Sequence, residues 1–110
     1  MAQLVVDDAA ITVEMSRWER LGALRREVTQ PVAAVVSVQR VDNARKQVKG
    51  LRLPGTGVPG KILLGTFVRK HKQFAAAYNN DPGYVITFKG CEYTEVIVSM
   101  PASEDIDALG

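Results

Sequence analysis

The second half of the chain is a series of short apolar runs separated by residues that favour turns, and this alternation limits the fold more than any other feature. None of the runs exceeds eight residues, and all are rich in β-branched or aromatic side chains, which is typical of β-strands. We predict strands at residues 61–68, 73–78, 84–89 and 93–100. The connections at 69–72, 79–83 and 90–92 are short enough for tight turns, and they therefore predict antiparallel hairpins.

The first half of the chain predicts more strands and one helical turn. Apolar and polar residues alternate over 11–16, as in a strand with one buried face. Ser16 and Glu19 have the spacing of a capping box, which predicts that a short helix begins there. Trp18 starts an apolar stripe that continues with Leu21 and Leu24. Further strands are predicted at residues 28–30, 35–41 and 48–53.

These elements predict a mainly β fold with one C-terminal α-helix. A chain of 110 residues is the size of one domain. About seven short antiparallel strands suit a small barrel or sandwich. Ser103 is a suitable N-cap for a terminal helix, and Ile106 and Leu109 begin the apolar stripe of that helix. We expect this helix to plug an open end of the sheet structure.

The sequence resembles the bacterial pleckstrin-homology-like domains, especially small actinobacterial ones. The resemblance rests on GLRLPGTGVPGKILLGTF at residues 50–67, KQFA at 72–75, the strand at 84–89, and VIVS followed by Pro101. It implies a split barrel of two roughly orthogonal sheets, capped by a C-terminal helix and used for binding. It does not imply a particular ligand.

Compartment and redox state follow from what the sequence lacks. There is no run of about 18 apolar residues that could span a bilayer, and residues 1–8 do not resemble a signal peptide. We therefore expect a cytoplasmic protein. Cys91 is the only cysteine, so neither an internal disulfide nor an ordinary structural zinc site is expected.

The charged residues are unevenly distributed along the chain. Residues 40–72 contain nine basic residues and one acid, a local charge of +8, whereas residues 92–110 contain five acids and no base. One interpretation is a solvated surface whose two ends attract each other within the fold. Another is pairing of the two segments between subunits, and on this basis we predict a homo-oligomer.

Two basic turns are the candidate binding site. They would form one cationic rim if both turns lie at the same end of the barrel, and such a rim would attract an acidic protein segment or anionic lipid headgroups. Trp18 is a candidate partner anchor, although a tryptophan at the start of an apolar stripe more often seals the end of a barrel. The candidate rim residues are Arg45, Lys46, Lys49, Arg69, Lys70 and Lys72.

The loop at residues 55–61 carries two motifs that the surrounding sequence contradicts. It matches the first seven positions of a phosphate-binding P-loop, but Ile62 stands where Ser or Thr must bind magnesium, and the residues that follow favour a strand. Gly55, Gly57 and Gly60 also match a dinucleotide fingerprint, but no βαβ unit surrounds them. We therefore expect no nucleotide, and interpret the glycines as shaping a corner of the sheet.

The remaining polar residues do not suggest catalysis. His71 lies in a lysine-rich turn without a nucleophile beside it, and the sequence neighbours of Cys91 do not favour a thiolate. Aromatic residues are only 6% of the chain and are not interleaved with the basic turns, so nucleic-acid binding is not expected. The sequence predicts a non-enzymatic module, without a cofactor, that binds a protein, a peptide or itself. Peripheral association with an anionic membrane is the alternative.

Overall fold

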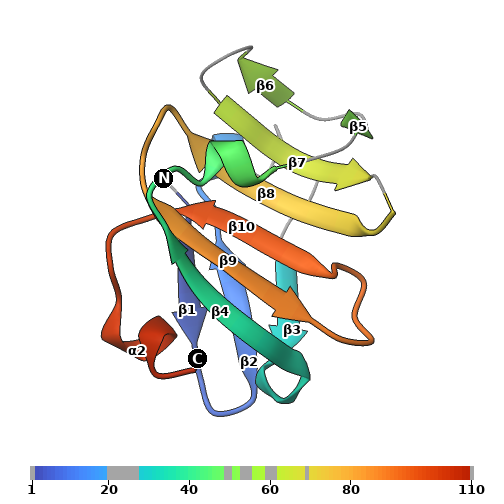
Figure 1. Cartoon of the computed structure of the whole chain (residues 1–110), viewed down its shortest axis with the longest axis vertical. Coiled ribbons are helices and arrows are strands. Elements are labelled where there is room, and N and C mark those ends of the chain that lie inside the picture. Colours follow the sequence, from blue (N-terminus) through green and yellow to red (C-terminus); the bar gives the residue numbers. More distant parts are fainter. Residues whose placement is uncertain are drawn as a thin grey trace.

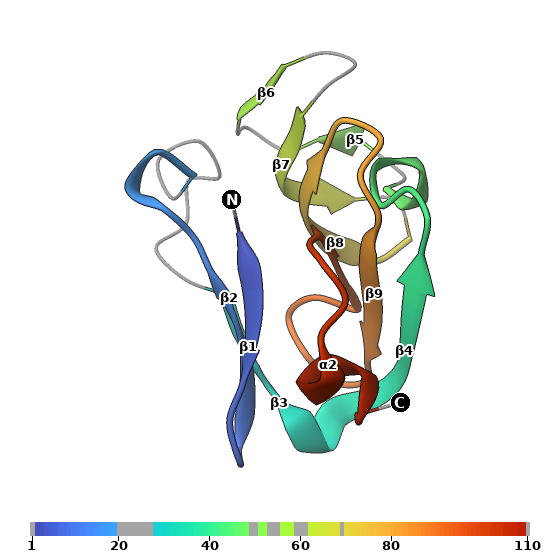
Figure 2. The same cartoon turned by 90° about the vertical axis from the view of Figure 1, so that its left-hand side faces the viewer.

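The strands of this chain form two sheets that face one another (Figure 1, Figure 2). The structure is a computed structural model, and it describes residues 2–19, 28–48, 51–52, 56–58, 62–68 and 70–109. The described residues are mainly β, as predicted, and end in a short helix. They contain ten strands instead of about seven, and the strands do not close into a barrel.

The smaller sheet contains three antiparallel strands in the order β1-β2-β3. Alternate residues such as Leu4 and Val13 are buried, so one face of this sheet is apolar. Asp7 shapes the β1–β2 turn, because its carboxylate accepts the backbone N–H groups of Ala9 and Ala10, each at 2.7 Å. The strands are β1 (Gln3–Val6), β2 (Ala10–Glu14) and β3 (Val28–Pro31), of which β1 was not predicted.

The larger sheet has the order β4-β9-β10-β8-β7-β5, and β6 also pairs with β7. A 3-10 turn, η1 (Val32–Ala34), leads from the smaller sheet into β4, and a second, η2 (Arg45–Gln47), follows β4. The strands are β4 (Val35–Val41), β5 (Leu51–Arg52), β6 (Thr56–Val58), β7 (Ile62–Val68), β8 (Lys72–Tyr78), β9 (Gly83–Phe88) and β10 (Glu95–Ser99).

The antiparallel prediction is wrong at one place in the larger sheet. β10 lies between β8 and β9, antiparallel to β9 but parallel to β8. The turn at 79–83 therefore joins two strands that are not hydrogen-bonded to each other, and it does not form a hairpin. The hairpins β7–β8 and β9–β10 are present as predicted. Gly83 makes the insertion of β10 possible, since a Cβ atom there would lie only 2.0 Å from the carbonyl oxygen of Val98.

The glycine-rich segment contains a strand that was not predicted. The loop at 55–61 was interpreted as a corner of the sheet, but Thr56–Val58 form β6, which pairs with β7. Of the strand predicted at 48–53, Leu51 and Arg52 form β5, and residues 49, 50 and 53 lie outside the described residues. Ile62 begins a strand, as predicted, and not the helix that a P-loop requires. Pro54, Gly55 and the segment 59–61 lie outside the described residues.

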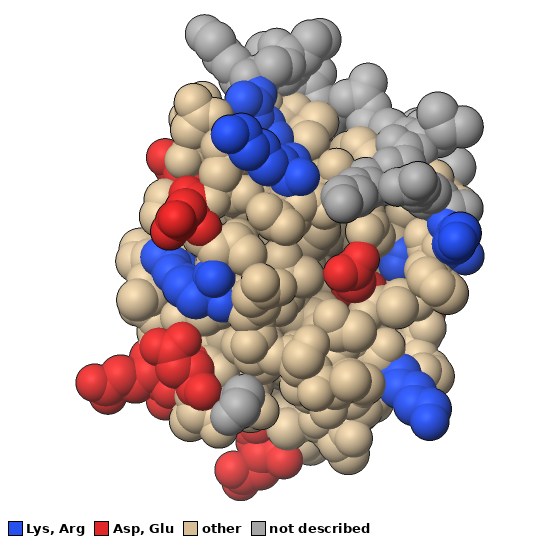
Figure 3. Space-filling model, in the orientation of Figure 1, with Lys and Arg blue, Asp and Glu red and all other residues tan. Residues whose placement is uncertain are grey.

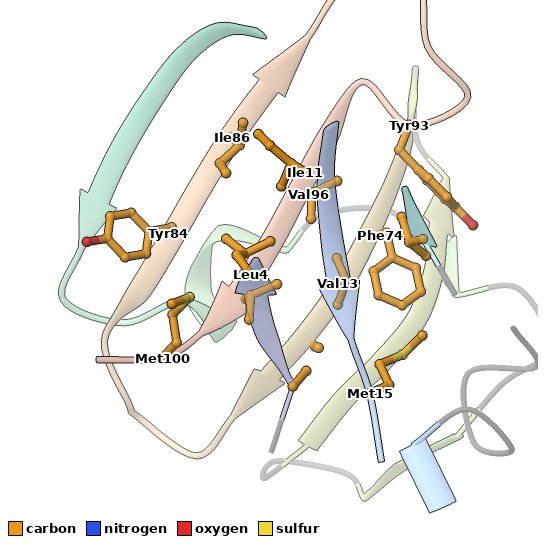
Figure 4. Close-up of a cluster of buried hydrophobic side chains, with 14 of the residues drawn as sticks. Leu4, Ile11, Val13, Met15, Phe74, Tyr84, Ile86, Tyr93, Val96 and Met100 are labelled. Carbon is orange, nitrogen blue, oxygen red and sulfur yellow. The ribbon is translucent and has the colours of Figure 1, made fainter. Parts of the chain in front are cut away.

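The main core lies between the two sheets. Figure 4 shows Leu4, Ile11 and Val13 of the smaller sheet among side chains of the larger one, including Ile86 and Val96. The helix α2 (Glu104–Asp107) adds the fully buried Ile106 to this core. It begins as predicted, because the Ser103 hydroxyl accepts the backbone N–H of Ile106 at 3.4 Å.

A buried glutamine joins the two sheets at the β9–β10 turn. The side-chain amide of Gln30 in β3 donates to the carbonyl oxygen of Tyr93 at 3.1 Å, and its amide oxygen accepts the Tyr93 N–H at 2.8 Å. The Tyr93 ring packs edge-on against Phe74, with 5.5 Å between the ring centroids. Gln30 thus provides hydrogen-bond partners for a backbone N–H and a backbone carbonyl at the edge of the core.

Candidate interaction surfaces

The two basic turns lie at opposite ends of β8 and do not form one rim. The guanidinium of Arg45 donates to the Asn80 side-chain oxygen at 3.1 Å, just beyond the last residue of β8. Lys70 precedes β8 and Lys72 is its first residue. A seven-residue strand is about 20 Å long, which separates the turns by roughly that distance. On the face in Figure 3, basic side chains form separate groups with acidic ones among them.

The other members of the predicted rim fall into two groups. Lys46 is exposed and follows Arg45 in η2, so these two residues stay together. Lys49 and Arg69 lie outside the described residues. The described members of the predicted rim thus form two separate pairs, Arg45 with Lys46 and Lys70 with Lys72.

Trp18 combines both of the roles considered for it. Its side chain is 51% exposed, while its ring packs edge-on against Tyr78, with 6.3 Å between the ring centroids. The ring therefore covers part of the core and also offers an aromatic surface to solvent. Leu21 and Leu24, the rest of the predicted stripe, lie outside the described residues.

A buried carboxylate lies beside Trp18. The predicted capping box is confirmed: the Ser16 N–H donates to Glu19 at 2.9 Å, and the Glu19 N–H donates to the Ser16 hydroxyl at 3.4 Å. Glu19 is fully buried, and its second carboxylate oxygen accepts a hydrogen bond from the Tyr78 hydroxyl. The sequence predicts the capping box but not the contact of Glu19 with Tyr78, which lies 59 residues further along the chain.

The hydrogen bonds of Glu19 decide its charge state. Burial alone would raise the pKa of Glu19, but the hydrogen bonds from Tyr78 and Ser16 outweigh it and hold the pKa below its usual value of 4.5. Burial, with the hydrogen bond to Glu19 and the negative charge of Glu19, raises the pKa of Tyr78 above its usual 10.0. The pair is therefore a carboxylate and a neutral phenol at neutral pH, an arrangement that joins two elements of the fold.

Tyr84 fastens the acidic C-terminal helix to the larger sheet. Its hydroxyl donates to the Asp107 carboxylate at 2.8 Å and accepts the Ser103 N–H at 2.8 Å. The Arg40 guanidinium lies 4.8 Å from the centre of the Tyr84 ring and donates to the carbonyl oxygen of Met100 at 2.7 Å. Glu104 and Asp105 are exposed and give this part of the surface a negative charge.

β4 is a terminal strand of the larger sheet, paired with β9 on one side. It has seven residues, of which only Arg40 is charged. Val36 lies at a bulge in the pairing with β9 and is 62% exposed, the highest value among the large hydrophobic side chains of the described residues. A terminal strand with few charges presents unpaired backbone groups to other chains.

A surface hollow of about 340 Å³ lies near the end of β4. It is lined by Asp81, Pro82, Met100 and Pro101, and Val41 of β4 pairs with Gly83 next to it. Its lining is mostly apolar. The hollow could therefore receive an aliphatic side chain from a partner.

The two residues considered for chemistry lie in turns. His71 is exposed in the β7–β8 turn. Cys91 is half-buried in the β9–β10 turn, where its Sγ lies 3.9 Å from the carbonyl oxygen of Lys89. Within the described part of the chain, no helix is long and apolar enough to cross a membrane.

Comparison with known proteins adds no relative. No protein-family model, curated protein or solved structure matches this chain. The resemblance to pleckstrin-homology-like domains therefore stays a prediction.

Proposed function

We propose that this chain is a non-enzymatic interaction module whose β4 edge receives an extended strand from a protein partner. The observation that carries the proposal is the position of β4 at the end of the larger sheet, with a single charged residue among seven. Strand addition gives affinity through backbone hydrogen bonds and selectivity through alternate side chains. A pleckstrin-homology-like barrel would equally be a binding module, so the resemblance supports the same class of function.

The surroundings of β4 favour binding, because they hold the strand in place before a partner arrives. The Arg40 side chain is held against its own sheet by the Tyr84 ring and by the hydrogen bond to the Met100 carbonyl. Ser37 and Gln39 are exposed and can form hydrogen bonds with a partner. A pre-ordered edge loses little conformational entropy when it binds.

A displayed library of extended peptides tests the proposal. We expect wild-type protein to select peptides that bind at least tenfold more weakly to the variant V36K/Q39K, since lysines protect edge strands. The matched control is Q3K/V5K, which makes the same two substitutions at exposed positions of β1 in the other sheet. Peptides that bind V36K/Q39K as tightly as wild type, or no selected peptides, would refute strand addition at β4.

Membrane association is the second candidate, supported by the exposed Lys70 and Lys72. Each basic residue near an anionic surface contributes about 1 kcal/mol, so this pair would supply only about 2 kcal/mol. That is weaker than a single myristoyl chain, which by itself gives marginal binding. Salt-sensitive co-sedimentation with anionic but not neutral vesicles, lost in K70A/K72A, would favour this alternative over strand addition.

A further inference from the structure

We propose that the strand received at β4 carries an aliphatic and a basic side chain on one face, two residues apart. The aliphatic side chain enters the hollow beside Met100, and the basic side chain lies beside the exposed acids Glu104 and Asp105 of α2. This chemistry of the partner segment rests on the proposed function and on what lies beside each face of the β4 edge.

The two faces of the larger sheet offer different surroundings to a strand at this edge. Neighbouring residues of a strand point to opposite faces, so Val38 and Arg40 share one face and Val41 lies on the other. Arg40 marks the face toward the smaller sheet, because its guanidinium lies over the ring of Tyr84, a residue of the main core. Val41 packs on the opposite face with Ala44, beside η2. The side chains of a partner strand alternate in the same way.

α2 borders the face that Val38 and Arg40 share. It contacts β4 and also β1 of the smaller sheet, and its Ile106 belongs to the main core (Figure 2). Glu104 and Asp105 of this helix remain exposed. The segment with the basic turn η2 packs against the other face of the larger sheet. A partner side chain on the Val38 face therefore meets the acids of α2, which favour a lysine or an arginine.

The hollow lies at the end of the same face. Met100 belongs to the main core, and its carbonyl oxygen accepts the hydrogen bond from Arg40 at 2.7 Å. The hollow beside it has a volume of about 340 Å³, and Asp81 is the one charged residue among its described lining. Pro101 also lines the hollow, and the chain runs from there directly into α2. An apolar hollow next to an acidic helix suits an aliphatic side chain beside a basic one.

Arg40 decides the order of the two partner side chains along β4. Like charges directly opposite each other destabilise a strand pair, so the basic residue should lie opposite Val38 and not opposite Arg40. The aliphatic residue, two positions away on the same face, then lies opposite Arg40, whose guanidinium already reaches Met100 at the hollow. There it can pack on the methylene groups of Arg40 and enter the hollow.

Selection from the peptide library, followed by NMR spectroscopy of the complex, tests the proposal. We expect the peptides that bind wild type more tightly than V36K/Q39K to share an aliphatic and a basic residue two positions apart. The Met100 methyl group should show nuclear Overhauser effects to the aliphatic side chain of the peptide. The methyl group of Met15, buried just beyond β2, should show none and is the internal control. Contacts of the aliphatic side chain with other residues but not with Met100 would overturn the use of the hollow.

A double-mutant cycle tests the charge contact. Replacing the basic residue of a selected peptide by glutamine should weaken binding to wild type by about threefold to fivefold, as for an exposed ion pair. The same replacement should make no difference to binding by E104Q/D105N. The matched control D8N/E14Q, which neutralises two exposed acids of the first two strands and their turn, should behave like wild type. An equal loss of affinity with E104Q/D105N and with wild type would overturn the contact with α2.

The salt dependence of binding to wild type provides the same test if E104Q/D105N does not fold. Added salt should weaken the binding of the selected peptide more than that of its glutamine variant, because salt screens exposed charges. Equal salt dependence of the two peptides would overturn the charge contact.

The outcomes also separate this proposal from strand addition itself. Truncating the aliphatic residue of the peptide to alanine should weaken binding by about tenfold, because the hollow loses apolar contact. Selected peptides that depend on β4 but lack the aliphatic and basic pair would overturn the proposed chemistry and leave strand addition standing. Peptides that bind V36K/Q39K as tightly as wild type would overturn both.

Discussion

The hydroxyl of Tyr78 donates a hydrogen bond to the carboxylate of Glu19, and this bond joins the turn after β2 to the last residue of β8. The contact connects the smaller sheet to the larger one. Gln30 and Tyr93 make a second polar link between the sheets. Buried polar groups that are fully hydrogen-bonded specify one packing arrangement. The two links should therefore fix how the sheets face each other.

Replacing Tyr78 by phenylalanine should destabilise the protein. The ring remains, but one oxygen of the buried Glu19 carboxylate loses its donor, which costs about 1–3 kcal/mol. Urea unfolding followed by circular dichroism measures this change. The exposed substitution Q39A is the control and should change the free energy of unfolding by no more than about 0.5 kcal/mol. Equal stabilities of Y78F and wild type would mean that the hydrogen bond does not stabilise the fold.

The stability of the protein should fall in acid, partly because of Glu19. The pKa of Glu19 is lower in the folded chain than its usual 4.5, so its contribution is present above about pH 4.5 and is lost as the pH falls through the folded pKa. Backbone N–H groups of Ala9 and Ala10 lower the pKa of Asp7, which acts in the same direction. Between pH 5 and pH 3, the free energy of unfolding of wild type should therefore fall more steeply than that of E19Q. The stability of E19Q should still fall somewhat, because Asp7 is unchanged.

The hydrogen bond between Tyr78 and Glu19 also predicts that the protein loses stability at high pH. The pKa of Tyr78 is raised above 10.0 in the folded chain, so its contribution is complete below pH 10.0 and declines above it. Urea unfolding between pH 9 and pH 11 measures this loss. The free energy of unfolding of Y78F should fall less steeply with pH in this range than that of wild type. Identical pH dependence in the two proteins would contradict a raised pKa of Tyr78.

The close approach of β9 and β10 predicts different outcomes at two glycines. A Cβ atom at position 83 would lie 2.0 Å from the Val98 carbonyl oxygen and 2.8 Å from the Ser99 Cα, so Gly83→Ala must displace backbone. We expect Gly83→Ala to lower the free energy of unfolding by more than about 3 kcal/mol, as severe overpacking of a core does. Gly90→Ala meets no atom within 4 Å, and its φ of +76° predicts a smaller loss of about 1 kcal/mol. Thermal unfolding compares the two, and a larger loss at Gly90 would contradict this account.

The attachment of α2 should depend on the hydroxyl of Tyr84. Y84F removes the partner of the Ser103 N–H and of the Asp107 carboxylate while keeping the ring beneath Arg40. We expect the amide of Ile106 to exchange with solvent at least fivefold faster, since local opening follows the lost hydrogen bonds. Measurement by NMR should find the amides of β10 unchanged. Unchanged exchange at Ile106 would show that the apolar contacts alone hold the helix.

Local features of this fold could be predicted from the sequence, whereas the order of the strands could not. The caps at Ser16 and Ser103 and the strand 35–41 are set by neighbouring residues, and the structure confirms them. Periodicity indicates which face of a strand is buried but not which strand lies beside it. For that reason the insertion of β10 between β8 and β9 was missed.

The candidate surfaces depend on the same non-local information. The sequence places Arg45 and Lys70 in turns, but only the direction of β8 shows that these turns lie at opposite ends. Likewise, the sequence predicts a strand at 35–41, but only the sheet topology shows that this strand pairs with β9 on one side and ends the larger sheet. The burial of Glu19 requires the packing of the two sheets and has no local sequence signal.

Hydrogen exchange of β4 with and without a peptide selected by the wild-type protein tests the central claim most directly. If β4 receives an extended strand, the amides within residues 35–41 should exchange more slowly when the peptide is bound, while those of β1 (Gln3–Val6) should not change. V36K/Q39K should abolish the difference. Rates in β4 that the peptide does not change, or slowing confined to another strand, would contradict the account.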